Sequence, residues 1–133
     1  MAALTLEIVT PERRVATLQA DEVRAPGILG GFGIRKDHTP FMSQLSPGRL
    51  TVVDGGSEVH YAIGGGFLQV ADNKVMVLAD SAEQRDEIDV ERAKRAFTEA
   101  TERLRSLAEG DENHPTEAAR VRRAAARLDV AGR

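Results

Sequence analysis

The sequence predicts an all-β N-terminal sandwich or barrel followed by a C-terminal antiparallel α-helical hairpin. Residues 1–83 hold 10 of the 12 glycines and 4 of the 5 prolines, whereas residues 84–133 hold 10 alanines and only two glycines. Apolar residues also alternate in the first part but recur every three or four positions in the second. Glycine with β-branched residues is typical of strands and turns, while alanine, glutamate and arginine favour helices. We therefore expect a β domain at 1–83 and a helical hairpin at 84–133.

Short strands and frequent turn signals fill the first part. Leu4, Leu6 and Ile8 alternate with polar residues, which indicates a half-buried strand that ends before Pro11. The other expected strands are residues 15–23, 50–53, 59–63, 67–70 and 75–78. Turn residues separate the last four into two hairpins. Because no helical period intervenes, an antiparallel sandwich or barrel is the expected architecture.

Two helices are expected in the second part. The first spans 89–109, with Asp89 as its N-cap and Gly110 as its stop. Its apolar stripe comprises Val90, Ala93, Phe97, Ala100, Leu104 and Leu107, and that of the second helix comprises Ala118, Val121, Ala125 and Leu128. A short linker between helices favours an antiparallel pair. Since alanine buries little apolar surface, we expect the hairpin to dock weakly, as a switch would.

Composition excludes several classes of protein. The absence of cysteine removes disulfide scaffolds, thiolate zinc sites and cysteine nucleophiles. A net charge of -3 and only 4% aromatic residues argue against a nucleic-acid coat or a stacking platform. The N-terminus lacks the basic start and apolar run of a secretory signal, and no apolar run is long enough to span a bilayer. We expect a soluble chain that reaches a membrane only through a partner.

No self-sufficient active site is expected. The glycine clusters at 30–33 and 64–66 do not open a helix, so turns and close backbone approach explain them better than a phosphate cradle. The three histidines, His38, His60 and His114, have no ligand-like spacing, and no nucleophile signature is present. Neither a catalytic residue nor a metal site is therefore predicted.

Two clusters keep a functional interpretation open. Arg120, Arg123 and Arg127 share one face of the second helix, opposite its apolar stripe, with Arg122 close by. They form either a solvated face or a cationic ridge that docks on an acidic surface or a phosphate. The run from Ile88 to Ala93 is either an ordinary helix cap or part of a ligand site.

Several ordered motifs resemble one family. Residues 6–11 are similar to the opening strand of that family. Residues 31–34 and 38–40 are similar to one of its loops, except that Asp37 replaces the usual glycine before the histidine. Residues 65–70, 73–75, 78–80 and 82–83 give the most specific series. Over essentially its whole length, the chain resembles the epsilon subunit of the bacterial F-type ATP synthase.

The resemblance implies a β-sandwich with a helical hairpin and a place on the rotary central stalk. It implies a non-catalytic subunit that couples proton translocation to ATP synthesis and inhibits ATP hydrolysis through its C-terminal helices. The implied partners are the gamma subunit, the c-subunit ring and the catalytic beta subunits, on the cytoplasmic face of the bacterial plasma membrane. The partner-binding loop would include Phe32, Ile34, His38 and Pro40.

The resemblance also implies a regulatory nucleotide, although no cofactor is required. Some bacterial members bind ATP through an I/L-D-x-x-R-A motif and arginines of the second helix. The corresponding residues here are Glu83, Ile88, Asp89, Arg92, Ala93, Arg123 and Arg127. The residues implied in inhibition are Arg120, Arg122, Arg123 and Arg127. A free-standing ATP-sensing regulatory module, from a different class of protein, remains the alternative.

Overall fold

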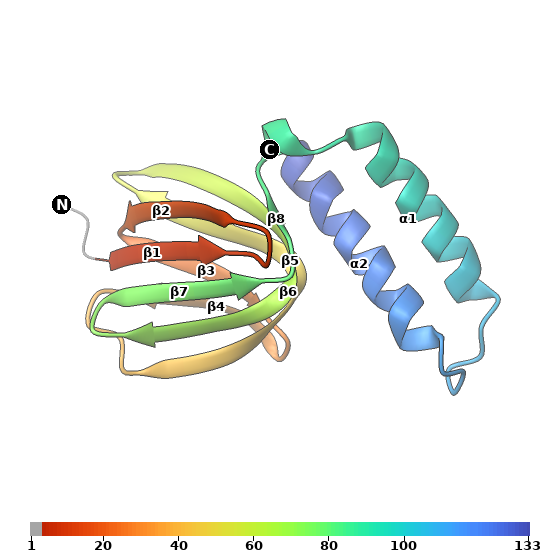
Figure 1. Cartoon of the computed structure of the whole chain (residues 1–133), viewed down its shortest axis with the longest axis horizontal. Helices are drawn as coiled ribbons and strands as arrows, with labels where there is room; N and C mark the ends of the chain where they lie inside the picture. Colours follow the sequence, from red (N-terminus) through yellow and green to blue (C-terminus); the bar gives the residue numbers. More distant parts are fainter. Residues whose placement is uncertain (1–3) are drawn as a thin grey trace.

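The computed structural model describes residues 4–133 and confirms a β-sandwich followed by two helices (Figure 1). Residues 1–3, part of the N-terminus considered above, lie outside the described residues. The strands are β1 (Leu4–Val9), β2 (Arg14–Ala20), β3 (Glu22–Gly27), β4 (Gly30–Arg35), β5 (Phe41–Asp54), β6 (Ser57–Ala71), β7 (Lys74–Ala79) and β8 (Ala82–Glu83). The helices are a 3-10 turn, η1 (Arg85–Glu87), then α1 (Val90–Arg105) and α2 (His114–Ala131).

The strands join in the order β2-β1-β7-β6-β5-β3-β4, and β8 adds to β6. Every pair is antiparallel except β1 with β7, which run parallel, so the expected all-antiparallel arrangement is wrong at this one place. The extended segment expected at 15–23 is two strands, because the chain changes partner at Asp21. β2 pairs with β1, whereas β3 pairs with β4 and β5.

The two predicted hairpins share one long strand. β5 and β6 pair from Phe41↔Val70 to Asp54↔Ser57, and β6 then pairs with β7. The glycine cluster does not end β6, which continues through Gly66 at a φ of 138°. A Cβ at Gly66 would collide with the carbonyl oxygen of Leu78 on the neighbouring strand. Close backbone approach, expected from the sequence, is therefore the structural reason for this glycine.

Large apolar side chains from every strand but β8 fill the interior of the sandwich. They form the main core of the described residues. Leu6, Ile8, Val23, Ile34 and Leu68 have no exposed surface, as the alternation along their strands requires. Tyr61 is almost as buried, and its hydroxyl accepts a hydrogen bond of 3.0 Å from the Gln84 side chain. Burial raises the pKa of this phenol, against the opposing effect of the Gln84 bond. A complete core of this kind lies within the strands alone.

The first helix begins where the sequence places it but ends earlier. The Asp89 side chain caps α1 by accepting a hydrogen bond of 3.1 Å from the Arg92 backbone amide, which confirms the predicted N-cap. α1 ends at Arg105, so Gly110 does not stop it. On α2 the predicted stripe is displaced, since Ala125 is exposed whereas Ala124 and Ala126 are buried. The reason is that α2 contacts the sheet on one side and α1 on another.

Candidate functional site

A small apolar interface joins α2 to the sandwich. Its buried residues are Ala62 on β6, Ile88 after η1, and Ala126 and Val130 on α2. In Figure 1, α2 stands between the strands and α1, so the sheet reaches the hairpin mainly through α2. Each buried methylene contributes roughly 0.8 kcal/mol, and an alanine side chain offers a single methyl. The hairpin is therefore docked through few apolar contacts.

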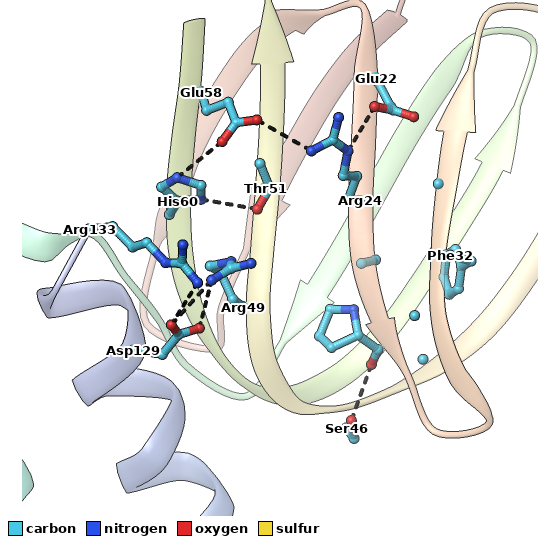
Figure 2. Close-up of a pocket in the computed structure, with 15 residues that line it drawn as sticks. Glu22, Arg24, Phe32, Ser46, Arg49, Thr51, Glu58, His60, Asp129 and Arg133 are labelled. Atoms are coloured by element: carbon cyan, nitrogen blue, oxygen red, sulfur yellow. Dashed lines mark hydrogen bonds and ion pairs between the residues drawn. The ribbon is translucent and has the colours of Figure 1, made fainter.

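Two ion pairs supplement this interface, and both remain partly open to solvent. The Arg49 guanidinium on β5 donates two hydrogen bonds to Asp129, at 2.9 and 3.2 Å (Figure 2). The Arg127 guanidinium donates to Glu83 of β8 at 2.6 Å. All four side chains are between 29% and 42% exposed. Ion pairs at this exposure contribute at most about 1 kcal/mol each, so they can open without a large cost.

A third ionic cluster joins the two helices to each other. Glu117 of α2 accepts hydrogen bonds from Arg103 of α1 at 3.0 Å and from Arg120 at 2.6 Å. Its side chain is only 9% exposed. The Arg103 hydrogen bond, followed by the charges of both arginines, holds the pKa of this carboxyl below its usual value. Sequence reasoning missed Glu117, although an acidic residue on the face of α2 that meets Arg103 is a signal for such a pair.

The residues implied in nucleotide binding lie around the junction of β8, α1 and α2. Glu83 and Arg127 are in direct contact, while Ile88 is buried in the docking interface and Asp89 caps α1. Ala93 is buried between the helices. These positions are structural in the folded hairpin, whatever else they bind.

Arg92 and Arg123 differ from Arg127 in having no anionic partner. Within residues 4–133, neither guanidinium makes a hydrogen bond or ion pair. Since α1 and α2 are antiparallel and Arg103 meets Glu117, Arg92 lies level with the turn of α2 that carries Arg127. The Arg123 stem lies close to Gly64, where an added Cβ would be 3.3 Å from its Cδ. One end of the hairpin thus carries two uncompensated cations beside a third.

The arginine ridge is not a single solvated face. Arg123 and Arg127 lie on the side of α2 that meets the sandwich, and Arg120 belongs to the Glu117 cluster between the helices. This corrects the expectation that the arginines lie opposite the apolar side of the helix. Only Arg122 is exposed and, among the described residues, without an ion pair.

The residues of the predicted partner-binding loop divide between core and surface. Ile34 is fully buried in the core, so its side chain is not available to a partner. His38 and Pro40 are in the link between β4 and β5, and Phe32 stacks edge-on against Phe41 with ring centroids 5.3 Å apart. Beside them, Met42 is 66% exposed. The loop therefore offers an aromatic and thioether surface.

A groove of about 690 Å³ lies on the sheet face beside the end of α2 (Figure 2). Its charges compensate one another, since Arg24 lies between Glu22 and Glu58, and Arg133 joins Arg49 on Asp129. His60 bonds to the Thr51 hydroxyl at 3.0 Å and approaches Glu58. We call the junction of β8, α1 and α2, with Arg92, Arg123 and Arg127, the arginine junction. A groove without free charge is a weaker ligand site than this junction.

Two kinds of feature are absent from the part of the chain that the structure describes. No group of three or more His, Cys, Asp or Glu side chains within 4–133 is placed to hold a metal ion. In the same range, no helix combines the length and the hydropathy needed to cross a membrane.

Comparison with known proteins gives consistent matches over the whole chain. The family described as ATP synthase, Delta/Epsilon chain, beta-sandwich domain matches residues 3–85, and the corresponding long alpha-helix domain matches residues 86–132. An ATP synthase epsilon chain from Anaeromyxobacter sp. (strain Fw109-5) is 69% identical, covering 98% of this chain and 99% of the relative. The epsilon chain of Myxococcus xanthus (strain DK1622) is 49% identical, covering 98% of this chain and 96% of the relative.

A solved structure agrees with the sequence matches. A chain in the mitochondrial ATP synthase of Euglena gracilis, from a complex described as OSCP/F1/c-ring in rotational state 1, superposes with a TM-score of 0.81 at 25% identity. The match covers 100% of this chain and 83% of that chain. Sequence motifs, domain matches and architecture thus agree, and the chain belongs to the ATP synthase delta/epsilon chain family, among the bacterial epsilon chains.

Proposed function

We propose that the chain is a non-catalytic rotor subunit in the central stalk of a bacterial F-type ATP synthase, which couples proton translocation to ATP synthesis. Its β-sandwich binds the gamma subunit and the c-subunit ring, on the cytoplasmic face of the plasma membrane. Its hairpin restrains ATP hydrolysis by extending toward the catalytic beta subunits. Support comes from the family match over both domains and from the F1/c-ring complex in which the structural neighbour resides.

One observation carries the regulatory part of this proposal. The sandwich has its own core of large side chains, whereas the hairpin rests on four buried residues and two partly exposed ion pairs. An element held by so few contacts can detach while the rest stays folded. The folded hairpin then corresponds to the non-inhibitory state.

Assembly tests the division of labour. A chain ending at Glu83 should fold and should still co-elute with gamma on gel filtration, because the core lies within the strands. The full-length chain provides the reference. A full-length chain that does not co-elute with gamma would favour the free-standing ATP-sensing module, and a truncated chain that alone fails would show that the hairpin takes part in binding.

Inhibition is tested most cleanly at Arg122. Arg120 and Arg127 hold the folded hairpin through Glu117 and Glu83, so their removal changes both states. Arg122 makes no ion pair with the described residues, and an arginine fork suits acidic side chains of a beta subunit. Arg122→Ala should raise ATP hydrolysis by the complex and leave synthesis nearly unchanged. Arg95 is also exposed but lies on α1. Arg95→Ala therefore serves as the control and should change neither rate.

The regulatory ligand we propose is ATP, bound at the arginine junction of the folded hairpin. Arg92 and Arg123 would contact its phosphates, and Arg127 would exchange Glu83 for a phosphate oxygen. Asp89 and Glu83 would then face the sugar, the base or an associated cation, because carboxylates repel phosphates. ATP bound only to the folded form stabilises that form by mass action, and hydrolysis is released from inhibition while ATP is plentiful.

Isothermal titration of the full chain with ATP tests this ligand. The wild type should bind ATP. Arg92→Ala and Arg127→Ala should each bind ATP at least about tenfold more weakly, because each loses a charge-assisted hydrogen bond. Arg95→Ala should bind like the wild type, since Arg95 lines a surface formed only by residues of α1. Absence of heat from the wild type at millimolar ATP would return Ile88–Ala93 to an ordinary helix cap.

A further inference from the structure

The turn before His38 has an unusual backbone for its residue. The His38 amide donates to the carbonyl oxygen of Arg35 at 3.3 Å, which closes a four-residue turn. Asp37, the third residue of that turn, has a φ of 64°. Positive φ at this place is typical of a type II turn and favours glycine or asparagine. Aspartate tolerates this conformation less readily than glycine, so hydrogen bonds from outside the turn would stabilise it.

Asn73, in the turn between β6 and β7, supplies that support. Its side-chain oxygen accepts a hydrogen bond of 2.6 Å from the Asp37 backbone amide, and its amide nitrogen donates to the Asp37 carboxylate at 3.3 Å. Asn73 is itself fixed, because its carbonyl oxygen accepts a hydrogen bond from the Thr5 amide at 3.0 Å. We call this reciprocal pair of bonds between Asp37 and Asn73 the loop clamp.

The clamp leads directly into the exposed aromatic surface. His38 donates from Nδ1 to the Thr39 carbonyl oxygen at 2.7 Å, and its ring meets Phe41 edge-on at 5.5 Å. Phe41 is 38% exposed and continues the contact to Phe32. The orientation of His38 and Phe41 thus depends on a turn that is tied to the neighbouring β6–β7 hairpin.

We propose that Asp37 and Asn73 are positioning residues that preform the surface of the 36–42 segment for the c-subunit ring. This proposal rests on the proposed function, in which the sandwich binds the ring, and it goes further by assigning that contact to the partner-binding loop. A loop ordered before binding does not lose conformational freedom on contact, so the clamp increases affinity without touching the partner. Asp37 and Asn73 then act on binding through the order of the turn, by about the value of one net hydrogen bond.

Asn73→Gly isolates the clamp. Glycine accepts the φ of 61° at this position, so the turn survives while both clamp bonds are lost. Asp72→Gly is the matched control, because Asp72 lies in the same turn with a φ of 50° but makes no hydrogen bond to the loop. The His38 amide, which is bonded to Arg35 and not to Asn73, reports on the order of the turn as a whole.

Three measurements on the full chain decide the proposal. In Asn73→Gly, hydrogen exchange at the His38 amide and dissociation from ATP synthase membranes depleted of this subunit should each rise about fivefold, the value of one net hydrogen bond. The thermal midpoint should stay close to that of Asp72→Gly, whose exchange and binding should match the wild type. Unchanged exchange, or unchanged binding despite faster exchange, overturns the proposal. If the wild type itself fails to bind, the proposed function fails, and the exchange rates alone decide whether the clamp orders the loop.

Discussion

The sandwich and the hairpin use different means to stay folded. The sandwich buries leucine, isoleucine, valine and tyrosine side chains from strands that are distant in sequence. The hairpin meets the sheet through Ile88, Ala126 and Val130, and it adds ion pairs that water can reach. Within one chain, the free energy of unfolding is therefore concentrated in the strands, and the helices can open at a much smaller cost. Weak docking of the hairpin, expected from its alanines, stays a prediction.

The largest effect is expected in the sandwich. Leu6→Ala removes a side chain with no exposed surface and should lower the free energy of unfolding by about 2–5 kcal/mol, through lost burial and a cavity. Urea denaturation measures it. Leu78→Ala, the same change at a leucine that is 53% exposed, should cost far less. Equal losses in both variants would contradict a core confined to the inner faces of the strands.

A smaller effect is expected where α2 meets the sheet. Val130→Ala removes two buried methyl groups, so docking should weaken by about 1.5 kcal/mol. Amide exchange in α2 should then accelerate about tenfold while exchange in the strands stays unchanged. Val90→Ala, at an exposed valine, is the control. Faster exchange in both regions would mean that hairpin and sandwich unfold together.

Acid should separate the two helices through Glu117. Its folded-state pKa lies below the usual 4.5, so its contribution is complete above about pH 4.5 and is lost as the pH falls through the folded-state value. Hydrogen exchange at the amides of α1 and α2 between pH 6 and pH 3, corrected for the exchange rate of an unfolded chain at each pH, measures this loss of stability. Glu117→Gln should lack that pH dependence and should be less stable at pH 6. A variant with the same acid profile as the wild type would assign the effect to other carboxylates.

The smallest effect is expected at the Arg49–Asp129 pair. Asp129→Asn should weaken hairpin docking by no more than about 1 kcal/mol, because both partners are partly exposed. Added salt should reduce the difference between this variant and the wild type. Asp86→Asn, at a side chain that is 93% exposed, gives the baseline. A loss of several kcal/mol would instead make this pair a main support of the docked hairpin.

Local signals in the sequence predicted the parts of the fold that depend on local physics. Alternation located Leu4, Leu6 and Ile8 in a buried strand, and hydrogen-bonding chemistry identified Asp89 as a helix cap. The parallel pairing of β1 with β7 was missed, since each strand has the same pattern whichever way its neighbour runs. The continuation of β6 through Gly66 was missed because the positive φ depends on how close β7 lies.

The candidate site was predictable as a set of residues but not as a geometry. The motif around Asp89 and the arginines of α2 were both identified from the sequence. Asp89 was also identified as a cap, but the contacts of the arginines were not, because the spacing along a helix does not show what packs against each face. Arg123 and Arg127 turned out to meet the sandwich, and the buried Glu117 carboxylate between the helices was overlooked. Helix α2 packs on two of its faces, one against the sheet and one against α1, whereas the spacing suggested a single packed face.

The unbroken strand β6 has a mechanical consequence. One of its ends, at Val70, pairs with Phe41 beside the aromatic loop, and Ala62, eight residues earlier, lies beneath α2. Ladder hydrogen bonds to β5 on one side and to β7 and β8 on the other fix the backbone between these points. Covalent bonds and paired backbone therefore connect the loop at residues 36–42 directly to the part of the sheet that lies beneath α2. Under the function proposed above, this strand would carry force between the loop that we assign to the ring and the hairpin that we assign to regulation.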